Sequence, residues 1–301
     1  MNQTTALLAL MTETSLHAGV GSSTGVIDLP IQREAHTEWP CVYGSAVKGA
    51  LRAYATESKI LESGDLTTLF GPERENAADS AGALAVGDAR LLLLPVRSFT
   101  GAFRWVTCPQ ALYRFKRDRQ RLGIDSKSDP FKVPEPEAES AVVCDTATGA
   151  QAKTETLFLE EYRLTVMSCS NLDTVVTALS RLVDRERFAE ELKRHLTVVS
   201  DDLFTVLTRS ATPVNARIAI DTETKTVRNG ALWYEETVPP ETLFYSAIVS
   251  QRSRSGQNLS ADEVMNRFNS LFKDFPWLQL GGNETVGMGW CGVHVVEAGH
   301  E

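Results

Sequence analysis

The sequence has few cysteines, no long apolar run and no early basic segment. Its five cysteines are widely separated and include no Cys-x-x-Cys pair, which argues against a structural zinc site and a disulfide framework. No apolar run approaches the roughly 20 residues that a membrane-spanning helix needs, so no membrane partner is expected. The first basic residue is Arg33, which predicts a chain without a secretory signal and a cytoplasmic location.

The overall charge is also unfavourable for a general nucleic-acid binder. The chain carries 30 Lys and Arg against 39 Asp and Glu, for a net charge of -9. Basic residues still cluster locally, and residues 113–121 (YRFKRDRQR) interleave two aromatic with five cationic side chains. We expect this run either to contact RNA or to face the acidic surface of a neighbouring copy.

The hydrophobic pattern predicts an α+β fold with alternating strands and helices. Strands are expected at 5–13, 83–95, 155–167, 242–249 and 290–296, and helices at 44–61, 108–121, 172–196 and 260–272. Residues 212–236 indicate a hairpin that projects from the body. Residues 123–153 contain three prolines and an acidic run, which predicts a long inserted loop. The order of elements is that of a split βαβ sheet.

Two glycine-containing segments are candidates for ligand contact. The loop GGNETVGMG (281–289) has four glycines but lacks the Gly-Lys-Ser/Thr ending of a nucleotide-binding P-loop. It either presents backbone N–H groups to phosphates or forms a tight turn into the last strand. The helix that starts at Gly44 carries Lys48 and Arg52 one turn apart, an arrangement that favours a bound phosphate or a solvated helix face.

Four segments carry a resemblance to a known family: HAGVGSSTGVIDLPIQRE (17–34), WPCVYGSAVKGALR (39–52), LWYEETVPPETLFY (232–245) and LGGNETVGMGW (280–290). In this order they resemble the RAMP superfamily of CRISPR-Cas proteins. The similarity is to the repeated backbone subunit of type III-B, Cmr-type, effector complexes. The resemblance implies a single modified ferredoxin-like (RRM-like) domain over 1–301, with copies stacked along a guide RNA beside other Cmr-type subunits.

The same resemblance implies a thumb hairpin and a cleavage chemistry. The hairpin at 212–236 matches the thumb, with apolar residues such as Val214 and Ile218 wedged between bases. The family's activity is metal-dependent cleavage of complementary target RNA, assigned to an aspartate that Asp28 matches. That carboxylate would hold a divalent ion, expected to be Mg²⁺, or accept the proton of an attacking 2'-OH.

Other residues receive roles through this resemblance. His17 would bind phosphate or assist proton transfer, or would be structural. Glu235 and Glu236 would meet the scissile phosphate, or would form a solvated strand end; Thr237 follows them where relatives often have tyrosine. The residues expected to contact RNA are Ser22, Ser23, Gly44, Ser45, Lys48, Arg52, Gly281, Gly282, Gly287 and Gly289.

Two other functions fit the same segments. In the first, the chain is a non-catalytic structural filament subunit, and the loops only hold the guide RNA. In the second, it is a guide-RNA-processing RAMP endoribonuclease, in which His17 performs metal-free acid-base chemistry. Replacement of Asp28 tests the first alternative, and cleavage in the presence of a chelator tests the second.

Overall fold

The computed structural model of the chain describes residues 3–72, 81–124, 131–144, 156–254 and 257–298. Its strands are β1 (Gln3–Thr12), β2 (Cys41–Val42), β3 (Leu84–Val86), β4 (Ala89–Arg97), β5 (Phe103–Thr107), β6 (Ser140–Val143), β7 (Thr156–Leu159), β8 (Tyr162–Ser168), β9 (Leu196–Val198), β10 (Val214–Ile220), β11 (Val227–Glu236), β12 (Leu243–Gln251), β13 (Trp277–Gln279) and β14 (Trp290–Glu297). Its helices are α1 (Gly44–Ser58), α2 (Ser63–Phe70), α3 (Pro109–Arg121), α4 (Leu172–Ser180), α5 (Phe188–His195), α6 (Asp201–Ser210), α7 (Ala261–Ser270) and the short 3-10 helix η3 (Glu284–Val286).

The centre of the fold is an antiparallel sheet built from distant parts of the chain. Four neighbouring strands have the order β14-β1-β12-β4, and β1 pairs with both β12 and β14. Helices α1 and α2 come between β1 and β4, and α7 comes between β12 and β14. The predicted mixed α and β architecture is therefore confirmed.

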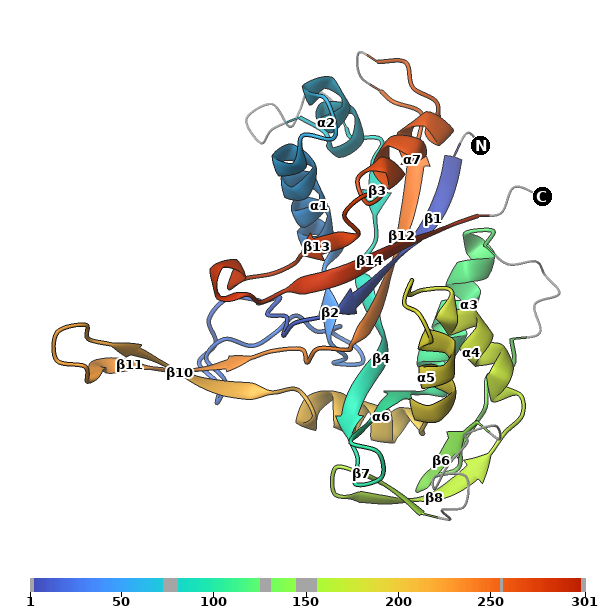
Figure 1. Ribbon diagram of the computed structural model, residues 1–301, viewed down its shortest axis with the longest axis vertical. Helices are drawn as coiled ribbons and strands as arrows, with labels where there is room; N and C mark the ends of the chain where they lie inside the picture. The colour runs from blue at the N-terminus through green and yellow to red at the C-terminus, as the bar shows by residue number, and fades with distance from the viewer. Residues whose placement is uncertain (1–2, 73–80, 125–130, 145–155, 255–256, 299–301) are drawn as a thin grey trace.

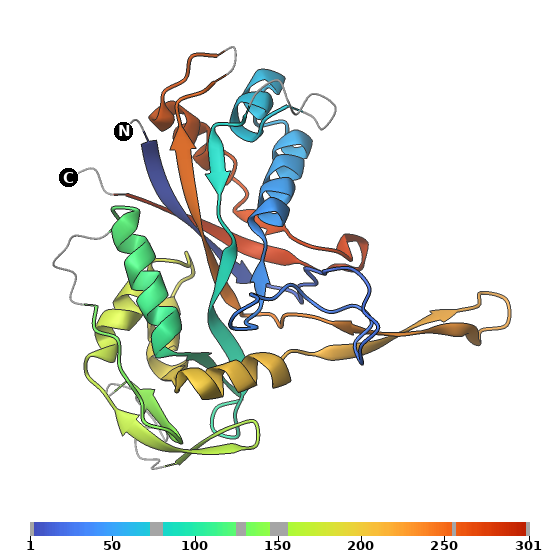
Figure 2. The ribbon, with the colours of Figure 1, turned by 180° about the vertical axis from the view of Figure 1, so that it is seen from behind.

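The period-two alternation of β1 explains why both faces of this sheet are covered. Leu8 and Leu10 point to one core, which contains buried residues of α1 and α7. Leu7 and Met11 point to the other core, where α3, α4 and α5 pack. Figures 1 and 2 show these two groups of helices on opposite sides of the sheet.

The sheet continues beyond β4 through five strands, of which only β7 and β8 overlap a predicted strand, at 155–167. Its path runs from β4 through β5, β9, β6 and β8 to β7. The long inserted loop predicted over 123–153 is not a loop throughout its described part, because β6 lies there and pairs with β8 and β9. The single helix predicted over 172–196 is two helices: α4 ends at Ser180, and α5 begins at Phe188 after Arg187, which has a left-handed backbone (φ 65°).

The predicted hairpin is confirmed, and it stands apart from the main sheet. Strands β10 and β11 form their own two-stranded sheet, which projects from the body in Figures 1 and 2. Ile218 lies opposite Leu232 in the register, and both are exposed. Among the helices in the described ranges, none combines the length and apolar character needed to cross a bilayer.

Candidate nucleic-acid interface

The two glycine-containing segments from opposite ends of the chain are in direct contact. The N–H of Gly282 donates to the carbonyl of His17 at 2.9 Å, and the N–H of Gly289 donates to that of Ser15 at 2.8 Å. At Gly281, where φ is +75°, a Cβ atom would lie 2.3 Å from the His17 carbonyl oxygen. Glycine is required there, because any side chain would force the two segments apart.

These glycines mainly allow two backbone segments to approach closely, rather than donating hydrogen bonds to a phosphate. The amides of Gly282, Gly287 and Gly289 are already bonded to carbonyl groups of this chain. At Gly289, a Cβ atom would lie 1.9 Å from the Leu280 carbonyl oxygen. The idea that these three amides are free for phosphate is therefore wrong, whereas contact between the loop and RNA stays a prediction.

Asp28 lies at the base of the projecting hairpin. Its Oδ2 atom accepts a hydrogen bond from the backbone N–H of Tyr234 at 2.7 Å. The next residue, Leu29, donates its N–H to the Tyr234 carbonyl and accepts from the Glu236 amide, both at 3.0 Å. Residues 28 and 29 thus extend along the outer edge of β11. The Asp28 side chain is half-buried, so it is held in place without being closed off from solvent.

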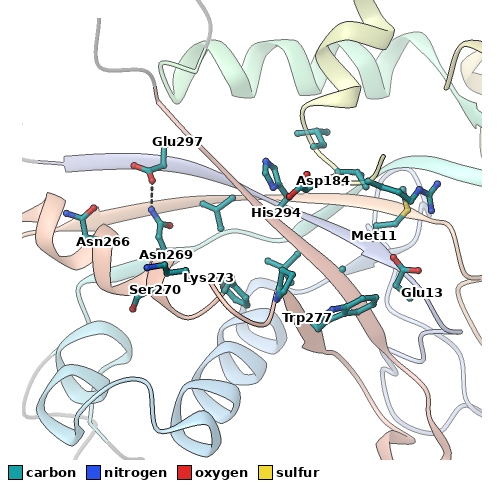
Figure 3. Close-up of a pocket in the computed structure, with 18 residues that line it drawn as sticks. Met11, Glu13, Asp184, Asn266, Asn269, Ser270, Lys273, Trp277, His294 and Glu297 are labelled. Atoms are coloured by element: carbon teal, nitrogen blue, oxygen red, sulfur yellow. Dashed lines mark hydrogen bonds between the residues drawn. The ribbon is translucent and has the colours of Figure 1, made fainter. Parts of the chain in front are cut away.

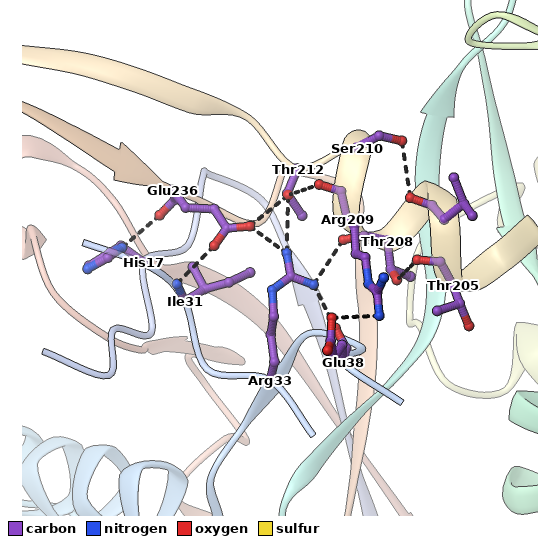
Figure 4. Close-up of polar contacts among 11 residues, drawn as sticks. His17, Ile31, Arg33, Glu38, Thr205, Thr208, Arg209, Ser210, Thr212 and Glu236 are labelled. Atoms are coloured by element: carbon purple, nitrogen blue, oxygen red, sulfur yellow. Dashed lines mark hydrogen bonds and ion pairs between the residues drawn. The ribbon is translucent and has the colours of Figure 1, made fainter. Parts of the chain in front are cut away.

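Glu236 joins the first loop (residues 18–34, between β1 and β2), the hairpin and the end of α6 (Figure 4). It is only 3% exposed. Its Oε1 atom contacts Arg33 Nη2 at 2.5 Å and accepts from the Thr212 hydroxyl at 2.8 Å. Its Oε2 atom accepts from the Ile31 amide at 3.1 Å. The alternative of a solvated strand end was therefore wrong for this residue, because its carboxylate is consumed by internal bonds.

The neighbouring residue, Glu235, is equally buried and also bonds to side chains from other segments. One oxygen accepts from Arg217 Nε at 2.9 Å, and the other accepts from the side-chain amide of Asn283 in the glycine loop. The solvated alternative was wrong here as well, since the strand end is covered by the glycine loop. Arg33, Arg217 and Asn283 were missed by sequence reasoning, because no local pattern marks partners that only tertiary contact supplies.

His17 lies beneath the first loop and is 9% exposed. Its Nδ1 atom is 2.7 Å from the carbonyl oxygen of Glu236. Because a carbonyl only accepts, Nδ1 must carry the proton, which leaves Nε2 facing the Glu235 carboxylate at 4.0 Å. A Cβ atom at Gly19 would lie 2.7 Å from Nε2, so the loop closes tightly over the ring. These contacts favour the structural interpretation of His17.

The cations at the start of α1 are directed into the protein. Lys48 Nζ donates to the Leu84 carbonyl and Arg52 to the Pro72 carbonyl, each at 2.9 Å. Burial, helped by the nearby Arg52 charge, lowers the pKa of Lys48. The Gly44 amide donates to the Asp88 carboxylate at 2.7 Å. No phosphate is therefore needed to offset the repulsion between Lys48 and Arg52. Contact of RNA with the start of α1 stays a prediction.

Three serines among the predicted RNA contacts are accessible. Ser22 and Ser23 lie on the exposed part of the first loop, and Ser45 is exposed on the first turn of α1. The Ser23 amide donates to the Asp28 carbonyl at 2.8 Å, which ties this serine to the residue at the hairpin base. Their side chains are therefore in a position to meet a ligand that crosses this face.

The basic run on α3 is largely used inside the chain. Arg114 makes a two-pronged contact with Glu34, one bond being 2.9 Å long. Lys116 donates to the Phe131 carbonyl, and the Arg119 guanidinium lies over the Phe115 ring. These three cations therefore stabilise the fold, and the run does not form one continuous basic surface.

A protein-built metal centre is not found in the described part of the chain. No group of three or more His, Cys, Asp or Glu side chains there is arranged to hold a metal ion. Asp28 offers one carboxylate, with one oxygen bonded to the Tyr234 amide. Mg²⁺ is often bound by one or two carboxylates together with water and substrate phosphate, so these residues fit only an ion shared with RNA.

A separate cavity of about 800 Å³ lies away from these residues (Figure 3). It is bordered by the end of α7, by β14 and by the segment between α4 and α5, with Lys273, Trp277 and His294 among its lining residues. None of the predicted site residues lines it. This cavity is therefore not part of the candidate site at the hairpin base.

Comparison with known proteins gives the same family over nearly the whole chain. A model of the RAMP superfamily matches residues 9–292. The chain is 38% identical over 296 residues to the CRISPR system Cmr endoribonuclease Cmr4 of Pyrococcus furiosus, covering 97% of this chain and 95% of that protein.

Solved structures agree with this relationship. The crystal structure of oligomeric Cmr4 from Pyrococcus furiosus matches with a TM-score of 0.73 and 30% identity over 99% of each chain. A chain of the type III-B Cmr-beta complex bound to cognate target RNA matches in fold, with a TM-score of 0.76 and 22% identity over 97% of each chain. The protein therefore belongs to the RAMP superfamily and, within it, to the Cmr4 family of CRISPR-associated proteins.

Proposed function

We propose that the chain is the guide-RNA-binding backbone subunit of a type III-B CRISPR effector complex and that it cleaves complementary target RNA. One observation carries this proposal: Asp28 is held, half-buried, at the base of the projecting hairpin by the Tyr234 amide, and Glu235, the next residue of the hairpin, bonds to Asn283 of the glycine-rich loop. The relative from Pyrococcus furiosus, at 38% identity, is named an endoribonuclease.

The fold supports a more specific description of this subunit. The strand order β14-β1-β12-β4, with α1 and α7 contributing to one core, supports a ferredoxin-like, RRM-like domain. We assign the whole chain to one such domain, with the hairpin as its thumb. The exposed apolar side chains of Ile218 and Leu232 suit insertion between stacked bases. Base pairing then supplies sequence choice, while the protein contacts the backbone.

Asp28 is the residue assigned to cleavage. Its Oδ2 atom is fixed by the Tyr234 amide, and Oδ1 has no hydrogen-bond partner among the described residues. Oδ1 is therefore the atom that would accept the proton of an attacking 2'-OH. A divalent ion, expected to be Mg²⁺, would be held by this carboxylate together with RNA phosphate and would stabilise the charge developing there.

Glu235, Glu236 and His17 are assigned positioning roles. Both carboxylates are buried and bonded to side chains from other segments, and the imidazole is covered by the first loop. They would hold the first loop against the hairpin so that Asp28 meets the RNA in one geometry. Direct contact of these groups with the scissile phosphate would require those bonds to break first.

The partners follow from the same assignment. Guide RNA, target RNA, further copies of the chain and other Cmr-type subunits are expected in one complex. Among the related structures, one is of an oligomer and another is of a complex bound to target RNA. An open site with contributions from several loops agrees with a ligand that continues from one copy to the next.

Two replacements of Asp28 separate its chemistry from its structural role. Asp28→Asn keeps an oxygen that accepts the Tyr234 amide, whereas Asp28→Ala removes that bond as well. We expect both variants to bind guide and target RNA in the assembled complex and to lose cleavage by about 100-fold or more. Undiminished cleavage by Asp28→Asn would instead support the non-catalytic filament subunit.

A chelator distinguishes the proposed function from guide processing. Cleavage of target RNA should stop when divalent ions are removed and should return when Mg²⁺ is added back. A histidine-dependent, metal-free reaction on precursor RNA would continue under chelation and would depend on His17 instead. Persistent cleavage of target RNA with chelator present would contradict the metal dependence proposed here.

A further inference from the structure

Arg217 spans the space between the hairpin and the glycine-rich loop. It lies on β10, and its Nε atom donates to Glu235 Oε2 at 2.9 Å. Its Nη2 atom is 3.5 Å from the sulfur of Met288, which belongs to the glycine-rich loop. The side chain is 34% exposed. The guanidinium therefore sits at the open surface where the hairpin and this loop approach each other.

Glu235 holds one edge of this guanidinium in place. The carboxylate is 3% exposed, and its second oxygen accepts from Asn283 and faces His17. Because the carboxylate is anchored from three sides, it orients Arg217 through Nε, and the edge of the guanidinium formed by Nη1 and Nη2 makes no bond to Glu235. Within the described residues, Nη1 has no hydrogen-bond partner and Nη2 has only the thioether sulfur, a weak acceptor.

Arg33, the other arginine beside the two contacting segments, has fewer unused donors than Arg217. The Arg33 guanidinium donates to Glu236, to Thr212 and to the carbonyls of residues 38 and 208. Lys48 and Arg52 lie on α1, and each donates one bond to a backbone carbonyl, that of Leu84 and that of Pro72. Arg217 differs in that a carboxylate fixes its orientation, and its Nη1 has no hydrogen-bond partner among the described residues.

We propose that Arg217 binds a phosphate of the guide RNA through Nη1 and Nη2, with Glu235 as its positioning residue. The inference rests on the proposed function and names a phosphate contact for it. A planar guanidinium with two donors on one edge matches the geometry of phosphate oxygens. Such a contact reads no base, so it tolerates a guide of any sequence.

The test measures binding of a fluorescein-labelled, unstructured single-stranded RNA to the full-length chain over a range of salt concentrations. We expect Arg217→Ala to bind about tenfold more weakly than wild type. The slope of log K against log salt should become shallower by roughly 0.7, the value for one phosphate contact on a single strand. Arg217→Lys keeps the charge but loses the planar pair of guanidinium donors, so its affinity should lie between those of Arg217→Ala and wild type.

A matched control and a double variant guard against indirect effects. Arg187→Ala removes the same side chain from an exposed Arg187–Glu190 pair at the start of α5, and should leave affinity and slope unchanged. The double variant Arg217→Ala/Glu235→Gln leaves no unpaired buried carboxylate, so its hairpin should fold, and it should bind as weakly as Arg217→Ala.

The outcomes separate this inference from the function on which it rests. Wild-type affinity and slope for Arg217→Ala, or for the double variant, would overturn the phosphate assignment and leave the proposed function standing. Failure of the wild-type chain to bind the RNA would overturn the proposed function, and this inference with it.

Discussion

The buried contact between Glu236 and Arg33 gives the most demanding stability prediction. Glu236→Ala would leave the Arg33 guanidinium without its carboxylate and would remove the acceptor of the Thr212 hydroxyl and the Ile31 amide. Loss of one partner from a buried ion pair costs about 3–5 kcal/mol. Because the Arg33 side chain is 21% exposed, we expect about 3 kcal/mol.

Glu236→Gln tests how much of this cost comes from charge. Glutamine keeps the size of the side chain and one carbonyl oxygen, which can still accept from Thr212 or Ile31. It loses the charged contact with Arg33, which is worth roughly 1.5–3 kcal/mol as a hydrogen bond to a charged group. The expected order of stability is therefore wild type, then Glu236→Gln, then Glu236→Ala.

Urea unfolding followed by circular dichroism measures these differences. Glu190→Ala, at an exposed Arg–Glu pair on α5, serves as the control and should cost less than about 1 kcal/mol. Combining Arg33→Ala with Glu236→Ala gives a double-mutant cycle, in which the two losses should be far from additive. A loss below about 1 kcal/mol for Glu236→Ala, or additive losses in the cycle, would refute the reasoning.

Three further predictions concern the loop, the acid stability and the hairpin. Gly289→Ala should lower the melting temperature more than Gly287→Ala, because both positions have positive φ but only Gly289 also closely approaches a carbonyl; equal losses would contradict this. Burial acts to raise the pKa of Glu34, but bonds from Arg114 and Thr37 outweigh it and leave the pKa below its ordinary 4.5. The stability that ionised Glu34 contributes is therefore complete above about pH 4.5 and is lost as the pH falls through the pKa of Glu34 in the folded protein. Glu34→Gln should therefore make the loss of stability with acid less steep in that range. Ile218→Asn, at an exposed position of the hairpin, should leave the melting temperature unchanged and reduce cleavage of target RNA; unchanged cleavage would argue against the wedge.

Local patterns in the sequence determined the elements whose stabilising contacts are close along the chain. The helix predicted at 260–272 appears as α7, because Ser260 and Glu263 form a reciprocal capping box at its start. The hairpin was predictable since alternating residues flank a polar turn, and β1 since its apolar run is buried on both faces. The family segments also pointed to Asp28 in the first loop, because such segments are recognisable in the linear sequence.

Tertiary structure alone decided which polar groups are free. Glu236 and Arg33 are 203 residues apart, and the Gly289 amide bonds to Ser15, so no local window contains both partners. Other tertiary contacts turn Lys48 and Arg52 toward backbone carbonyls, and they leave Arg217 Nη1 without a hydrogen-bond partner among the described residues. Hydrophobic periodicity and capping are read over a few residues, whereas satisfaction of a buried charge depends on whatever the folded sheet brings beside it.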